Sequence, residues 1–177
     1  IENIFIASLL HDIGKKIDSD ENIDYELQCI RGEMLVQKIP MLKDASKIIR
    51  YHFLDWKDWK GSIDKPLTIS SQIILLANFV DMMISRDRYI LHQVDNIWQE
   101  LFRLEDGILS SKVVEGFKKI SIQEEFWFDL TSYRLYSILL HDGPLKKKDI
   151  DLDELSNMGE LFKYVVDFKS KYTTTHT

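Results

Sequence analysis

The chain contains few residues that interrupt helices. Only seven glycines and three prolines occur among 177 residues, and long stretches contain neither. These two residues are the strongest local breakers of regular structure, and apolar residues recur along the chain at three- and four-residue steps. The sequence therefore predicts an all-α protein. Helices are expected over 1–16, 23–38, 42–54, 67–85, 89–104, 110–119 and 122–140, followed by an amphipathic helix from Leu155.

Charge and composition exclude several classes of protein. The formal net charge of −6 argues against a broad nucleic-acid-binding surface. The single cysteine, Cys29, cannot form an internal disulfide, which suits a reducing compartment. No apolar run approaches the roughly 20 residues that a membrane-spanning helix needs. We therefore expect a cytoplasmic protein without a membrane span.

The tetrapeptide Leu-Leu-His-Asp occurs twice, at residues 9–12 and again at 139–142. Gly143 and Pro144 follow the second copy directly, and such residues end a helix. The second copy thus predicts the end of a domain and not a second site. Because the chain begins with Ile1 and not with Met, we expect it to lie within a longer protein. The predicted organisation is a first domain over 1–142, a linker over 143–154 and the opening helix of a following domain over 155–177.

The first copy places the adjacent pair His11 and Asp12 in an otherwise apolar segment. Neighbouring helix residues point about 100° apart, so both side chains can reach one ion lying between them. A neutral nitrogen beside an anionic oxygen suits iron, manganese, zinc or similar ions, and an Asp can bridge two metals during phosphoester hydrolysis. Lys15, one turn beyond His11, would then contact a phosphate. The alternative is a hydrogen-bonded core His11 beside an ion-paired Asp12.

Two tryptophans form a second candidate feature. Trp56 and Trp59 alternate with lysines in the segment WKDWK. Aromatic side chains with nearby positive charge can stack against a nucleobase. The alternative is that both rings pack this loop against the domain.

Four segments resemble, in their order and spacing, the HD superfamily, and more narrowly the HD-GYP domains, which are metal-dependent phosphodiesterases of cyclic di-GMP. The segments are ASLLHDIGK, GEMLVQKIPMLKDASKIIRYH, ISSQIILLANFVDMM followed by RDRY, and GILSSKVVEGFKKI. The resemblance covers about residues 3–120. It implies an HD-domain helical bundle whose first helix, with the family's earliest ligand, would precede residue 1.

Several positions match functional residues of that family. His11 and Asp12 match the pair that gives the family its name, and Lys15 matches the lysine that approaches the substrate or metal centre. His52 matches the first member of a His-His pair of metal ligands. The C-terminal segment resembles the opening helix of a second HD-GYP domain, in which His176 would be an early metal ligand.

Three other positions depart from the family. Phe53 stands in place of the second His, Gln28 in place of a metal-binding His, and Asn78 in place of a metal-binding Asp. Phe cannot ligate a metal, and neutral amides are weak donors. Asp81, three residues after Asn78, is either a substitute ligand or a surface residue. The Gly-Tyr-Pro signature is also absent.

Two functions remain open at this point. The ligand losses favour a degenerate HD domain that holds no metal, or one weakly bound divalent ion such as Fe, Mn or Zn. Such a domain would regulate, or dimerise with, an adjacent HD-GYP-type domain in bacterial cyclic-dinucleotide signalling. The alternative is a phosphodiesterase that acts on cyclic di-GMP or another nucleotide. The expected partners are an adjacent HD-GYP-type domain, a second copy in a homodimer and a cyclic dinucleotide.

Overall fold

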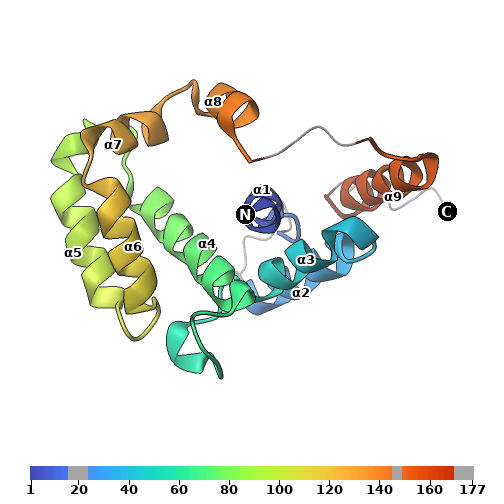
Figure 1. Cartoon of the computed structure of the whole chain (residues 1–177), viewed down its shortest axis with the longest axis horizontal. Helices are drawn as coiled ribbons and strands as arrows, with labels where there is room; N and C mark the ends of the chain where they lie inside the picture. The colour runs from blue at the N-terminus through green and yellow to red at the C-terminus, as the bar shows by residue number, and fades with distance from the viewer. Residues whose placement is uncertain (16–23, 145–148, 170–177) are drawn as a thin grey trace. The chain divides into compact units, whose positions relative to one another are not determined.

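The computed structural model describes residues 1–15, 24–144 and 149–169 (Figure 1). Across these ranges the protein is helical and contains no β-strand, which confirms the all-α prediction. The chain divides into two compact units. The first comprises Ile1–Phe53 with the described part of Lys146–Thr177, and the second comprises Leu54–Leu145.

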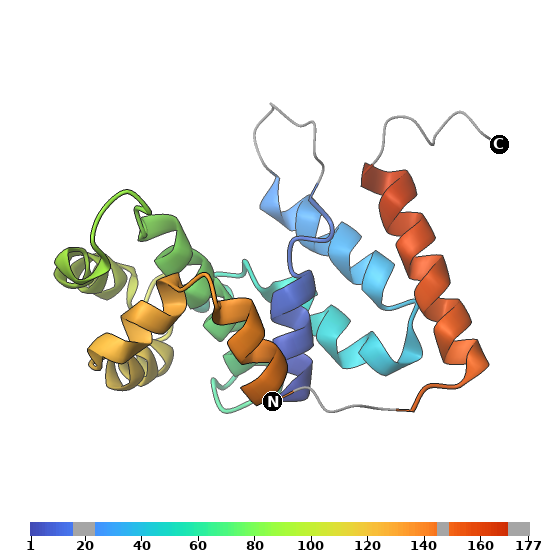
Figure 2. The ribbon, with the colours of Figure 1, turned by 90° about the horizontal axis from the view of Figure 1, so that it is seen from above.

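The first unit is a small helical bundle built around α3. Helix α3 packs against both α1 and α2, and α9 packs against α2 (Figure 2). Small and branched apolar side chains fill its core. The helices are α1 (Glu2–Leu10), α2 (Tyr25–Val36), α3 (Lys43–Tyr51) and α9 (Leu152–Lys169), with a 3-10 turn, η1 (Pro40–Leu42), before α3. Buried apolar residues include Ala7, Cys29, Val36, Ala45 and Ile49.

The first helix ends earlier than the sequence predicts. α1 stops at Leu10, and the next residues form turns in which the Lys15 N–H donates to the Asp12 carbonyl. These turns bring Gly14 onto α2, where an added Cβ would lie 2.2 Å from the Gln28 carbonyl oxygen and 2.5 Å from the Gly32 nitrogen. The predicted helix over 1–16 was therefore wrong at its end, because the backbone bends to meet α2.

The last described helix begins earlier than predicted. α9 starts at Leu152 and not at Leu155. Asp151 accepts a hydrogen bond from the Glu154 N–H at 2.8 Å, and the Glu154 carboxylate accepts one from the Asp151 N–H at 3.3 Å. This reciprocal arrangement is a capping box, which satisfies two N–H groups at the start of a helix.

The second unit is built around α4. Helix α4 packs against α5 and α6, α6 packs against α7, and α7 packs against α8. The helices are α4 (Pro66–Met83), α5 (Val94–Leu104), α6 (Ser111–Ser121), α7 (Glu124–Thr131) and α8 (Leu135–Asp142), with the 3-10 turns η2 (Trp56–Asp58) and η3 (Ile90–His92).

The single helix predicted over 122–140 is in fact two helices. The backbone of Ser132 is extended, with φ −72° and ψ 135°. The Ser132 hydroxyl accepts a hydrogen bond from the Arg134 N–H at 3.1 Å, a side-chain contact that competes with helix continuation. The second Leu-Leu-His-Asp copy then closes α8 at Asp142, as predicted.

One helix in the described part of the chain, α4, is long and apolar enough to cross a membrane by length and composition alone. Core helices of soluble proteins pass the same test. Helix α4 packs against two other helices and buries the polar side chains of Ser71 and Gln72.

Candidate functional site

His11 directly follows α1 in the first unit. Its Nδ1 lies 2.7 Å from the Ser8 carbonyl oxygen. A carbonyl can only accept a hydrogen bond, so Nδ1 carries the proton and the lone pair of the neutral ring is on Nε2. That Nε2 atom lies 3.6 Å from Oδ1 of Asp12, whose side chain is half-exposed.

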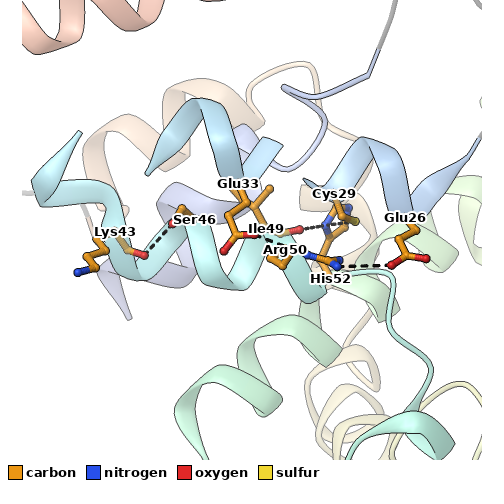
Figure 3. A network of polar contacts seen from close by, with 8 residues as sticks. All are labelled: Glu26, Cys29, Glu33, Lys43, Ser46, Ile49, Arg50 and His52. Carbon is orange, nitrogen blue, oxygen red and sulfur yellow. Dashed lines mark hydrogen bonds and ion pairs between the residues drawn. The ribbon is translucent and has the colours of Figure 1, made fainter. Parts of the chain in front are cut away.

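His52 follows α3 and has the same tautomer. Its Nδ1 lies 2.7 Å from the Ile49 carbonyl oxygen and 3.5 Å from the Cys29 sulfur (Figure 3). The side chain is fully buried, and its Nε2 has no hydrogen-bond partner among the residues that the structure describes. The rings of His11 and His52 meet edge to face, with centroids 5.4 Å apart. An Nδ1–H held by a backbone carbonyl is also how proteins orient metal-binding histidines.

Burial keeps the interior groups of this site uncharged. Removal from water lowers the pKa of His52 to about 4, so its ring is neutral at neutral pH. The same effect raises the pKa of the Cys29 thiol to about 11, so that thiol stays protonated. Cys29 is therefore a small core residue and not a reactive thiolate.

The buried side chain of Gln28 approaches the site from α2. Its Nε2 donates a hydrogen bond of 2.7 Å to Oδ1 of Asp12. This is the same oxygen that faces Nε2 of His11. The carboxylate oxygen nearest the imidazole is thus already engaged by an amide.

Aromatic rings fill the position next to His52. The Phe53 ring centroid lies 4.2 Å from that of His52 and 4.5 Å from that of Tyr25. Together with His11, these side chains form a row of four rings in contact. The contribution of Tyr25 was not predicted, because nothing in its sequence neighbourhood points to the site.

The residues present do not fit a complete metal centre. HD-type hydrolytic centres need several nitrogen and oxygen ligands around the ion. Within the described ranges, no group of three or more His, Cys, Asp or Glu side chains is arranged to hold a metal ion. What the site offers is two imidazole lone pairs and one carboxylate that already accepts a hydrogen bond. Lys15 is exposed and follows Asp12 by three residues in the chain.

The remaining predicted ligands are Asn78, Asp81 and His176. Asn78 and Asp81 are on α4, in the second unit, and Asp81 forms an exposed ion pair with Arg86 at 3.1 Å. His176 lies outside the described residues. For all three, a role in metal binding stays a prediction.

The two tryptophans lie in and beside η2. The Trp59 Nε1–H donates to the Leu54 carbonyl at 3.3 Å, and the Trp56 backbone N–H donates to the Ile108 carbonyl at 2.8 Å. Both side chains are half-buried. These contacts fix the loop, and stacking against a nucleobase stays a prediction.

Sequence reasoning did not identify the side chain that positions this loop. Gln72, fully buried in α4, donates to the Leu54 carbonyl at 3.0 Å and accepts from the Ser110 N–H at 2.9 Å. The sequence did contain a signal for this role, because Gln72 lies inside a strongly apolar helix. Buried polar groups are nearly always hydrogen-bonded, so a buried glutamine is expected to bind neighbouring polar groups.

Comparison with known proteins relates the N-terminal part of the chain to a known family. Residues 1–83 match the HD domain family. This part of the chain is therefore similar to HD domains, which are generally metal-dependent.

Two relatives match nearly the whole chain. This chain is 25% identical to the 3′3′-cGAMP-specific phosphodiesterase 1 of Vibrio cholerae serotype O1, over 98% of this chain and 44% of that protein. Its fold is similar to a crystal structure of cyclic GMP-AMP-specific phosphodiesterases in V. cholerae, with a TM-score of 0.74 and 18% identity, over 98% of this chain and 51% of that one. The fold match confirms the expected all-α HD architecture. The chain spans about half the length of these relatives.

Proposed function

We propose that this chain is a degenerate, non-catalytic HD domain that regulates an adjacent HD-GYP-type domain in cyclic-dinucleotide signalling. The observation that carries the proposal is the hydrogen bond from Gln28 to Asp12 at 2.7 Å. Phe53, which packs on His52, adds to it because a phenyl ring offers no ligand. Any ion held by His11, Asp12 and His52 would be a single, weakly bound Fe, Mn or Zn.

The comparisons support the signalling role. Both relatives are named as cyclic-dinucleotide phosphodiesterases, and this chain matches about half of each. That length difference is consistent with an adjacent HD-GYP-type domain. The proposal also includes a domain linker at 143–154, a homodimer and a location in the bacterial cytoplasm.

One observation favours the alternative, an active phosphodiesterase. His11 and His52 both present Nε2 lone pairs, with the opposite ring nitrogen held by a backbone carbonyl. This orientation is the one that metal-binding histidines adopt. A hydrolytic centre would nevertheless need further ligands beyond these two imidazoles.

Hydrolysis assays distinguish the two functions. We expect the purified chain to leave 3′3′-cGAMP and cyclic di-GMP intact in the presence of Mn²⁺, Fe²⁺ or Zn²⁺, with no linear product above the buffer blank in a chromatographic assay. A known cyclic-dinucleotide phosphodiesterase serves as the positive control. Turnover that disappears in His11→Ala would refute the non-catalytic proposal.

A further inference from the structure

The Asp12 carboxylate accepts its hydrogen bond from a neutral, buried donor. Gln28 is only 4% exposed as a whole residue, whereas the Asp12 side chain is 50% exposed. A carboxylate accepts hydrogen bonds only, so the amide nitrogen of Gln28 is the end that faces it. A hydrogen bond to an ionised group is roughly twice as strong as one between neutral groups.

We propose that the Gln28 amide takes the place of a bound cation at Asp12. In this role it holds the turn of His11 and Asp12 against α2, so that the first unit is stable without metal. The inference rests on the proposed function, because an occupied metal centre would use the same carboxylate oxygen. It goes beyond that function by proposing that Gln28 is the residue that keeps a metal ion from Asp12.

The backbone around this hydrogen bond reinforces the junction. Gln28 and Gly32 are four residues apart and therefore share one face of α2. On that face, Gly14 meets the Gln28 carbonyl and the Gly32 backbone, with no room for a side chain. The amide donor is thus held in place by the same contact that joins the turn to α2.

Two acidic residues of α2 pair with α3. Arg50, on α3, lies 3.5 Å from the Glu26 carboxylate and 3.6 Å from that of Glu33 (Figure 3). Arg50 is therefore occupied between these two carboxylates, while the Gln28 amide of α2 donates to the Asp12 carboxylate.

The test is the substitution Gln28→Glu, which keeps the size of the side chain but replaces the donor by a second carboxylate. Two like charges at hydrogen-bond distance repel, and the original bond is lost. We expect the Tm of the variant in EDTA to fall by roughly 5 °C. Millimolar Mn²⁺ should raise the Tm of the variant and leave that of the wild type unchanged, in a thermal melt followed by circular dichroism.

The matched control is Gln37→Glu, which makes the same charge change at an exposed position at the end of α2. Its Tm should stay within about 1 °C of the wild type. Gln28→Met removes the donor without adding charge, and it should lower the Tm by less than Gln28→Glu does. This second variant keeps the test decisive if the Glu variant does not fold.

Two results would overturn the inference. The first is a Gln28→Met variant as stable as the wild type, because the hydrogen bond would then not hold the junction. The second is an equal rise in Tm with Mn²⁺ for wild type and Gln28→Glu, because the amide would then not replace a cation. Either result would leave the predicted lack of hydrolysis unaffected. Conversely, hydrolysis by the wild type would refute the proposed function without changing the order of these Tm values.

Discussion

Replacing Gly14 by alanine is expected to lower the free energy of unfolding by about 3 kcal/mol, the upper end of the usual cost of overpacking. The added Cβ would lie 2.2 Å from the Gln28 carbonyl oxygen, 2.5 Å from the Gly32 nitrogen and 3.1 Å from the Gly32 Cα. All three atoms belong to the backbone of α2, so no side chain can rotate away to make room. The turn that carries His11 and Asp12 would have to separate from α2.

The matched control is Gly159→Ala in α9, which belongs to the same unit. A Cβ at Gly159 would meet no atom within 4 Å, and the residue is helical. Alanine should therefore stabilise this position by roughly 0.5–1 kcal/mol. Urea unfolding followed by circular dichroism measures both changes. A Gly14→Ala variant within 1 kcal/mol of the wild type would show that the close approach of the turn to α2 is not required.

Acidification from pH 7 to pH 5 is expected to cost about 2 kcal/mol of stability through His52 alone. Burial lowers the pKa of His52 in the folded protein from its ordinary value of 6.5 to about 4. Between these values the unfolded chain binds the proton and the folded protein does not. The contribution of His52 is therefore complete above pH 6.5, and it is lost as the pH falls toward 4.

The variant His52→Asn isolates this effect. Asparagine can still donate to the Ile49 carbonyl, but it does not titrate. We expect its stability to be lower at pH 7, while the loss between pH 7 and pH 5 becomes about 2 kcal/mol smaller than in the wild type. His141→Asn removes an exposed histidine and serves as the control. An unaltered slope in His52→Asn would contradict a buried, neutral His52.

The sequence predicted the parts of this molecule that depend on local pattern. The scarcity of glycine and proline predicted the all-α fold, and the order of motifs predicted the similarity to HD domains. The roles of His11 and Asp12 stay predictions. Helix ends were less predictable, because tertiary contacts set them. The bend that brings Gly14 onto α2 leaves no periodic signal, and the break at Ser132 depends on one side-chain hydrogen bond.

The candidate site, too, was predictable from the sequence only in part. The resemblance predicted that Gln28 and Phe53 stand at positions where the family has metal ligands. It did not indicate their contacts, because Gln28 and Asp12 lie 16 residues apart and meet only when α2 packs on the turn. The contact of Phe53 with Tyr25 likewise joins residues from different elements.

The central claim is that His11, Asp12 and His52 do not form a metal centre. The metal content of the purified chain, measured by mass spectrometry of its elements, tests this claim most directly. The account predicts Fe, Mn and Zn well below one equivalent per chain, with no difference between the wild type and the variants His11→Ala and Asp12→Ala. One equivalent or more in the wild type, lost in both variants, would contradict it.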